Sequence, residues 1–215
     1  MNKSKSKFFY FVLIVVAVCL TAAAAVIIAL SISHRDLVDI HDENGLEQFA
    51  REWAASNADE LKYGTACIDI ENCEINILAV TEEQPYAALY LNVTSTAETE
   101  GTGYMDCLAL FEERNSGGLY DCIAKSSNTG REMRAFSGTG LLTPGLQDWV
   151  YIFAGNSTDT GASAYSFNYN GTDYTKDIPD SGYVLDITVL PYGSSTEITD
   201  RYVLDASGNV LERYW

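Results

Sequence analysis

Histidine is scarce in this chain of 215 residues, which contains only His34 and His41. Both lie in a polar stretch, residues 33–45, that we interpret as a stalk ahead of the folded part. Hydrolases with a serine or cysteine nucleophile use a histidine base, and many zinc sites use histidine ligands. The sequence therefore predicts no catalytic residue, no metal site and no cofactor.

Basic residues are also few, with 13 Lys and Arg against 30 Asp and Glu and a net charge of −17. Four of the basic residues precede Asp36, the first acidic residue, so 9 basic residues face 30 acidic ones from there onward. Neutralising phosphates requires clustered Lys and Arg, and the nearest approach to a cluster is Arg131 with Arg134. We therefore exclude nucleic acid as a partner.

One long apolar run extends from Phe8 to Ile32, where 23 of 25 residues are apolar. As a helix it would measure about 37 Å, enough to cross a hydrocarbon core of about 30 Å. Lysines precede the run and acidic residues follow it, which by the positive-inside rule places the N-terminus in the cytoplasm. We predict a cytoplasmic tail (residues 1–7), a transmembrane signal anchor in the lipid bilayer (8–32) and an extracellular C-terminal domain, in a single-pass protein of the cell membrane.

Two alternatives remain for the apolar run. A signal peptidase could cleave after the small residues Ala22 to Ala25, although cleavage there would leave the apolar segment VIIALSI at the new N-terminus. Cys19 could instead be lipidated, as in a bacterial lipoprotein, although the residue before it is Val18 rather than a small one. Both objections favour a retained anchor.

No Cys-x-x-Cys motif occurs, and no histidine lies near the four cysteines beyond the apolar run, so neither a zinc site nor a thioredoxin-type site is indicated. These cysteines are Cys67, Cys73, Cys107 and Cys122. Outside the cytoplasm, an even number of cysteines favours disulfides. Three pairings are possible, and we favour the sequence-local one, Cys67 with Cys73 and Cys107 with Cys122, with free thiols as the alternative.

Chain geometry restricts both favoured pairs. A straight strand over residues 67–73 would hold its two cysteines about 20 Å apart, so a turn near Glu71–Asn72 is required. Cys107 faces Cys122 only if the hairpin between them turns at Arg114–Asn115. A turn centred on Ser116–Gly117 would offset the two cysteines by four residues.

One amphipathic helix is predicted over residues 46–63, because Leu46, Phe49, Ala50 and Trp53 recur at three- and four-residue spacing. Beyond Gly64, short runs rich in β-forming residues replace this period. There are eleven of them: INILAV, YAALYLNV, MDCLALF, LYDCIA, MRAFSG, DWVYIFAG, SAYSFNY, TDYTKDI, YVLDITVL, DRYVLD and NVLERYW.

We predict an α+β fold class with five parts. The tail and the transmembrane helix come first, followed by the stalk. Residues 46–126 form an α+β half, in which the helix packs on an antiparallel sheet, and residues 127–215 form an all-β half that resembles a β-sandwich. Within this last half, Asn170-Gly171 predicts a type I′ hairpin turn that places Phe167 opposite Tyr174 and Tyr165 opposite Lys176.

This order of elements resembles small exported proteins of Gram-positive bacteria, which are anchored by one N-terminal segment and have no known function. The resemblance is one of pattern, covers most of residues 45–215, and is carried by INILAV, YAALYLNV, CLALFEE, WVYIFAGN, SFNYNGTDY, YVLDITVLP and RYVLDASGNVL. It implies a location in the cell envelope and a two-part, β-rich domain. It supplies no catalytic residue.

Two kinds of side chain are candidates for chemistry or binding. The carboxylate pairs Glu82/Glu83 and Glu112/Glu113 could act on a sugar, but neighbours in a strand point to opposite faces, so we interpret them as solvated. Fourteen Tyr and three Trp could form a binding surface, although most are expected in the core. The candidates for an exposed surface are four aromatic residues around the Asn170 turn: Tyr165, Phe167, Tyr169 and Tyr174.

The leading hypothesis for function is a non-catalytic binding, sensing or accessory module of the cell envelope, with an envelope protein or a polysaccharide as its partner. One alternative is an enzyme that uses carboxylates on envelope polysaccharide. Another is a structural subunit of a membrane complex. The sequence names no ligand.

Overall fold

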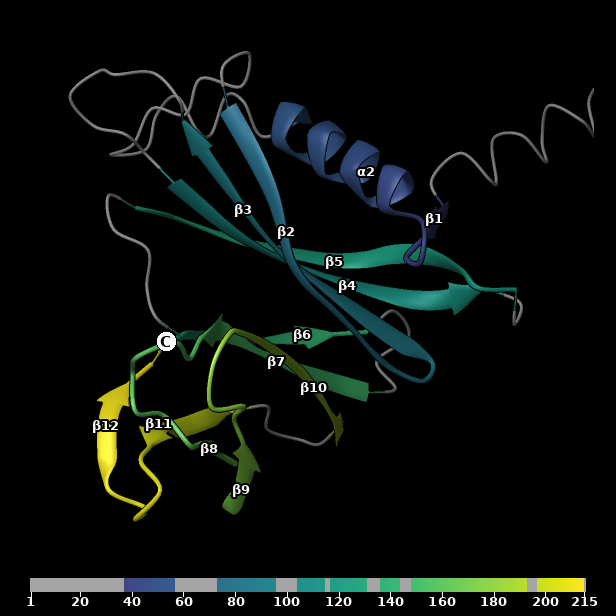
Figure 1. Cartoon of the computed structure of the whole chain (residues 1–215). Coiled ribbons are helices and arrows are strands. Elements are labelled where there is room, and N and C mark those ends of the chain that lie inside the picture. Colours follow the sequence, from purple (N-terminus) through teal and green to yellow (C-terminus); the bar gives the residue numbers. More distant parts are fainter. Residues whose placement is uncertain are drawn as a thin grey trace, which may run out of the picture. The chain divides into compact units, whose positions relative to one another are not determined.

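Three sheets and one helix make up the part of the chain that the computed structural model describes (Figure 1). This part comprises residues 37–56, 73–95, 104–114, 117–130, 136–143, 148–192 and 197–214. The described residues from Val38 onward belong to one compact unit.

The first sheet has five strands in the order β1-β5-β4-β3-β2. Its strands are β1 (Leu37–Asp39), β2 (Cys73–Glu83), β3 (Tyr86–Ser95), β4 (Tyr104–Arg114) and β5 (Leu119–Gly130). Strands β2 to β5 pair antiparallel in chain order, as a meander. Both faces of β3 are buried, which explains why its sequence YAALYLNV is apolar at nearly every position.

Helix α2 (Glu43–Ser56) covers one face of this sheet. Leu46, Ala50 and Trp53 lie on one side of the helix and are buried against the odd-numbered side chains of β3. Glu43 lies in the first turn, where the helix dipole favours a carboxylate. The helix that the sequence predicts over residues 46–63 is thus observed from Glu43 to Ser56, and residues 57–63 lie outside the described part.

The opposite face of the first sheet packs on a three-stranded sheet of order β10-β7-β6. Its strands are β6 (Phe136–Leu142), β7 (Asp148–Asn156) and β10 (Tyr183–Pro191). Tyr86 and Tyr90 on β3 share a core with Val150 and Ile152 on β7. The alternate side chains of β7 face a second core, so this strand is apolar from Trp149 to Ala154.

A four-stranded sheet of order β12-β11-β8-β9 completes the second core. Its strands are β8 (Ala164–Tyr169), β9 (Thr172–Asp177), β11 (Ile198–Leu204) and β12 (Val210–Arg213). Nearly parallel rings cross this core in a row, with neighbouring centroids 3.9 to 6.2 Å apart. We call these rings the aromatic row: Phe136, Phe153, Tyr165, Phe167 and Tyr174.

Each of the eleven predicted strand runs overlaps one observed strand, from β2 to β12. Strand β1 was not predicted. The boundary predicted between residues 126 and 127 falls inside β5, whose residues pair with β4 as far as Gly130.

The fold class predicted from the sequence is wrong in its first element. It placed a transmembrane helix over residues 8–32, which lie outside the described part of the chain. Within the described ranges no helix is long and apolar enough to cross a membrane. Helix α2 has 14 residues, against about 20 apolar ones that a span requires. The described residues therefore form a mostly β fold with one short helix, and they do not support the predicted single-pass anchor or the cell-membrane location.

The stretch interpreted as a stalk is folded from β1 onward. Strand β1 pairs with β5, and Val38 and Ile40 are buried in the core beneath α2. His41 follows in the turn before the helix, with its Nε2 atom 3.3 Å from Glu82 Oε1. One imidazole therefore belongs to the folded part, contrary to the expectation from the sequence.

The disulfide predicted between Cys107 and Cys122 is absent, and both thiols are free. Arg114 pairs with Leu119, so the axis of the β4–β5 hairpin lies two residues beyond the position that a Cys107–Cys122 pair requires. Cys122 consequently lies opposite Phe111. The register of the hairpin rules out the predicted pairing.

Burial raises the pKa of both of these thiols, to about 11 for Cys122. A thiol that stays protonated at neutral pH is a poor nucleophile. The other predicted pair joined Cys67 to Cys73, and Cys67 lies outside the described residues.

Candidate functional site

The β8–β9 hairpin has the turn and the register that the sequence predicts. Both residues of the Asn170–Gly171 turn have positive φ, 50° and 83°, as a type I′ turn requires. Phe167 lies opposite Tyr174, and Tyr165 lies opposite Lys176. The prediction of this hairpin is confirmed in turn and in pairing.

The four aromatic residues singled out as a binding surface lie mainly inside the fold. Tyr165, Phe167 and Tyr169 are buried, and Tyr174 is half-buried against them. The side of the hairpin that carries these rings faces the three-stranded sheet, so it forms core. Any recognition at this hairpin must use its other side.

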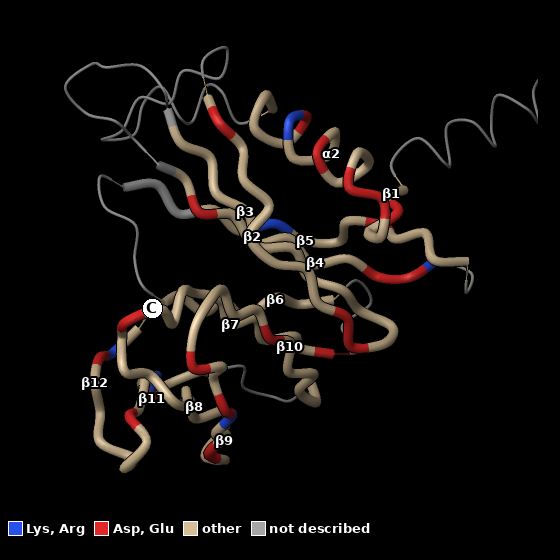
Figure 2. Tube along the Cα trace, in the orientation of Figure 1, with Lys and Arg blue, Asp and Glu red and all other residues tan. Residues whose placement is uncertain are grey.

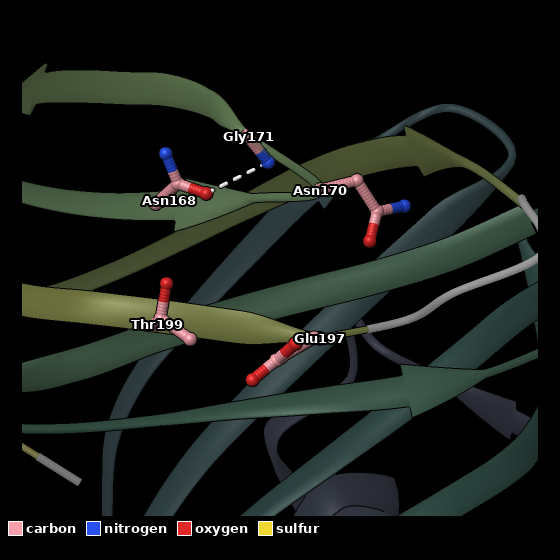
Figure 3. Close-up of a pocket in the computed structure, with 5 residues that line it drawn as sticks. All are labelled: Asn168, Asn170, Gly171, Glu197 and Thr199. Atoms are coloured by element: carbon pink, nitrogen blue, oxygen red, sulfur yellow. Dashed lines mark hydrogen bonds between the residues drawn. The ribbon is translucent and has the colours of Figure 1, made fainter.

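A pocket opens beside the tip of the hairpin, on the side away from the core (Figure 3). It has a volume of about 260 Å³, and its lining residues are Asn168, Asn170, Gly171, Glu197 and Thr199. The hairpin contributes the first three, and the start of β11 contributes the other two. Asn168 lies directly opposite Thr199 in the pairing of β8 with β11. We call this cavity the tip pocket.

An irregularity in β11 shapes one wall of the tip pocket. The pairing of β11 with β8 shifts between Thr199 and Tyr202, and Asp200 in this bulge has φ 50°. Bulges bend a strand and redirect its side chains. The N–H of Asn170 donates to the carbonyl of Glu197 at 3.4 Å, which holds the start of β11 beside the turn.

The hairpin wall of the pocket is held by its own hydrogen bonds. The Asn168 Oδ1 atom accepts from the Gly171 N–H at 2.9 Å, as the dashed line in Figure 3 shows. The Nδ2 of the same amide donates to Asp173 Oδ1 at 2.7 Å. Both ends of this amide are therefore occupied, and the wall is preorganised.

The β11 wall offers oxygen atoms to a ligand. Glu197 is exposed, and its carboxylate forms no hydrogen bond or ion pair within the described residues. Thr199 Oγ1 donates to Asp200 Oδ2 at 3.3 Å, so its lone pairs stay available as acceptors. Figure 2 shows acidic and basic positions interspersed on the strands of this sheet, so the acceptors of this wall reflect local placement rather than an acidic sheet.

A second polar cluster joins β2 and β5 to the turn before α2. The buried Tyr120 hydroxyl donates to Glu82 Oε2 at 3.2 Å and accepts from Gln84 Nε2 at 3.4 Å, while His41 approaches the other Glu82 oxygen. Burial raises the pKa of Tyr120, and the charge of Glu82 raises it further. The phenol therefore stays protonated, and the cluster ties three segments together.

The carboxylate pairs considered from the sequence do not form a catalytic pair. Glu82 and Glu83 are both exposed at the end of β2, where successive side chains point to opposite faces. Glu112 and Glu113 are half-buried, and Glu113 Oε1 accepts from the Gly118 N–H at 3.2 Å. Hydrolysis of a sugar needs two carboxylates on either side of one bond, which neither pair provides.

A third polar group bridges the two sheets of the second core. The buried Tyr165 hydroxyl donates to Asp186 Oδ2 at 2.5 Å, and Lys176 Nζ donates to the same oxygen at 2.7 Å. Burial, together with this hydrogen bond and the charge of Asp186, raises the pKa of Tyr165. Because Asp186 lies on β10 and its partners lie on β8 and β9, this cluster fastens one sheet to the other.

A buried carboxylate lies on β4 of the first sheet. Asp106 accepts a hydrogen bond from Asn92 Nδ2 at 3.1 Å. Burial raises its pKa above the ordinary 3.8, although hydrogen bonds from Asn92 and Tyr90 oppose the shift. The folded state therefore holds the proton of Asp106 more tightly than the unfolded state does.

In the wild type, Asp106 is expected to lower the free energy of unfolding as pH rises. Asp106→Asn should abolish this pH dependence. With a raised pKa, the folded state binds more protons above pH 3.8, so the free energy of unfolding falls until pH passes the folded-state pKa. The asparagine retains an acceptor for Asn92 and does not titrate. Urea unfolding between pH 3 and 7 measures this difference, with the exposed Asp177→Asn as control. Equal pH slopes for Asp106→Asn and wild type would exclude the effect.

The acceptor residues of the tip pocket were missed in the sequence. Asn170 was noted for its turn, but Glu197 lies 27 positions further along and has no motif around it. The Asn-Gly turn was the only available signal, because it marked an exposed tip. The strand that would pair beside that tip could not be read from local pattern.

Comparisons with known proteins do not identify a relative. No protein-family model, no curated protein and no solved structure matches this chain. The resemblance to exported proteins of Gram-positive bacteria stays a prediction. The function is therefore argued from the tip pocket itself.

Proposed function

We propose that this protein is a non-catalytic binding module whose ligand occupies the tip pocket. The observation that carries the proposal is the exposed carboxylate of Glu197, which has no internal partner among the described residues and stands beside the hydroxyl of Thr199. Ligand sites use a small number of placed polar groups to orient what they bind. A preorganised hairpin wall and an acceptor-bearing strand provide that arrangement here.

The composition of the lining favours binding over catalysis. Glycoside hydrolysis uses two carboxyl groups about 5–10 Å apart, whereas Glu197 is the only carboxylate among the five lining residues. Covalent catalysis needs a nucleophile and a base that both reach the substrate, whereas the Asp200 carboxylate that accepts a hydrogen bond from Thr199 does not line the pocket. The groups present can accept and orient hydrogen bonds without a paired acid and base.

The size of the tip pocket restricts its ligand. Pockets for drug-sized molecules and cofactors measure about 300–1,000 Å³ and are mostly apolar. At about 260 Å³ and with polar lining residues, the tip pocket accommodates one sugar ring or one side chain. We therefore expect it to bind a single polar group, either free or at the end of a larger partner.

Filling the pocket is expected to abolish binding. Thr199→Phe places a ring in the cavity on a strand that tolerates aromatic residues, so stability should change by no more than about 0.5 kcal/mol. The probes are glucose, glucosamine, N-acetylglucosamine and Nα-acetyl-lysine N-methylamide, each followed by saturation-transfer NMR with the full chain. We expect at least one probe to bind the wild type and none to bind Thr199→Phe.

Thr175→Phe is the matched control, because Thr175 is exposed on the neighbouring strand β9 and does not line the pocket. It should bind as the wild type does. Probe spectra after overnight incubation should be unchanged, since binding without turnover leaves the ligand intact. Undiminished binding to Thr199→Phe, or conversion of a probe by the wild type alone, would refute the proposal.

A further inference from the structure

The charge around the tip pocket is negative on both walls. Glu197 contributes a carboxylate to the lining. Two other lining residues donate hydrogen bonds to further carboxylates, Asn168 to Asp173 and Thr199 to Asp200. The groups left for a ligand, the Glu197 carboxylate and the Thr199 oxygen, are acceptors. A ligand that matches them must bring donors, and a positive charge adds attraction.

Basic side chains on the same strands do not neutralise this pocket. Lys176 Nζ donates to Asp186 Oδ2 at 2.7 Å and to the Ile187 carbonyl at 2.9 Å, on the core side of the hairpin. Arg201 donates to the Ile198 carbonyl at 3.5 Å, and its charge acts on the buried Tyr151 and Tyr214. Both cations thus have hydrogen-bond partners other than the Glu197 carboxylate.

We propose that the group held in the tip pocket is a primary ammonium, a proposal that rests on the binding function above. An ammonium is a compact cation with three donors, which suits one carboxylate with a neutral hydroxyl oxygen beside it. A bare calcium ion requires six to eight oxygen ligands at 2.3–2.6 Å, whereas the lining contains one carboxylate. The cavity also has room for the carbon atoms that carry an ammonium group.

An amino sugar and a lysine side chain both present this chemistry. The test therefore uses two pairs of probes in which acetylation removes the charge: glucosamine with N-acetylglucosamine, and Nα-acetyl-lysine N-methylamide with its Nε-acetylated form. Affinities are measured from amide shifts of the ¹⁵N-labelled full chain. In at least one pair we expect the charged probe to bind at least about threefold more tightly than the acetylated one. The pair with the larger ratio of affinities shows whether the ammonium comes from an amino sugar or from a lysine side chain.

Glu197→Gln keeps the shape of the side chain and removes its charge. It should weaken binding of the charged probe about threefold or more, and raising the salt from 0.05 to 0.5 M should weaken the wild type similarly. Asp177→Asn is the matched control, because it removes the same charge from β9 at the end of the hairpin away from the turn. This control should bind as the wild type does.

The outcomes of these titrations test the ammonium proposal and the binding proposal separately. Preference for charged probes that is lost in Glu197→Gln supports the ammonium site. If the amide shifts of Gly171 and Thr199 give equal affinities for the charged and the acetylated probes, the ammonium proposal is overturned and the binding function stands. No shift at the tip pocket with any probe would overturn both.

Discussion

Replacing Phe153 with alanine is expected to lower the free energy of unfolding by about 3–5 kcal/mol. Phe153 is fully buried in the aromatic row, with its ring centroid 3.9 Å from that of Tyr165 and 5.6 Å from that of Phe136. These neighbours belong to strands of both packed sheets, so they cannot collapse into the cavity. The loss is a large share of the 5–15 kcal/mol typical of a domain, and urea unfolding followed by circular dichroism measures it.

Two further variants keep this prediction testable if Phe153→Ala does not fold. Phe153→Leu retains much of the volume and should cost about 1–2 kcal/mol. Tyr192→Ala removes an aromatic ring that is 45% exposed and should change stability by no more than about 0.5 kcal/mol. A loss below about 1 kcal/mol for Phe153→Ala would contradict the role given to the aromatic row.

Gly138→Ala is expected to destabilise the protein by about 1–3 kcal/mol through overpacking. An added Cβ would lie 2.1 Å from the Tyr151 hydroxyl oxygen and 2.8 Å from Cε2 of Tyr214. Both rings are buried, and their hydroxyls form a chain in which Tyr151 donates to Tyr214 at 3.1 Å and Tyr214 donates to the Ser166 carbonyl at 3.1 Å. The methyl group must displace both rings and strain these bonds.

Gly45→Ala serves as the matched control, with an effect of opposite sign. Gly45 lies in α2, and the nearest atoms to an added Cβ are 3.4 to 3.7 Å away, which is ordinary contact. Alanine in a helix is favoured over glycine by about 0.5–1 kcal/mol, so this variant should be more stable than the wild type. Thermal and urea unfolding of both variants provide the comparison. A Gly138→Ala protein as stable as the wild type would show that the two tyrosines do not restrict this position.

Local elements of this fold could be predicted from the sequence because their signals are local. Short runs rich in β-forming residues locate every strand from β2 to β12, and the Asn-Gly dipeptide sets the register in which Phe167 lies opposite Tyr174. The β4–β5 register was harder, because its connection carries no comparably decisive turn signal. The favoured disulfide required a turn at Arg114–Asn115. The axis of the observed hairpin lies two residues further along the chain, which offsets Cys107 from Cys122.

Features that depend on contacts between distant segments could not be predicted. Tyr165 and Phe167 are buried because the three-stranded sheet covers that side of the hairpin, and no local pattern shows which side is covered. Strand β1 is three residues long and too short to show a period. The tip pocket combines a turn at Asn170 with a strand that starts after Glu197, and only the fold brings them together.

Amide chemical-shift mapping of the ¹⁵N-labelled full chain during titration with glucosamine tests most directly whether the tip pocket is the binding site. The largest shifts are predicted at the hairpin tip and the start of β11, at Asn168, Gly171 and Thr199, and Thr199→Phe should remove them. Shifts centred on another polar cluster, such as Glu82 with Tyr120, would contradict the binding site proposed here. Shifts at the tip that persist in Thr199→Phe would contradict it equally.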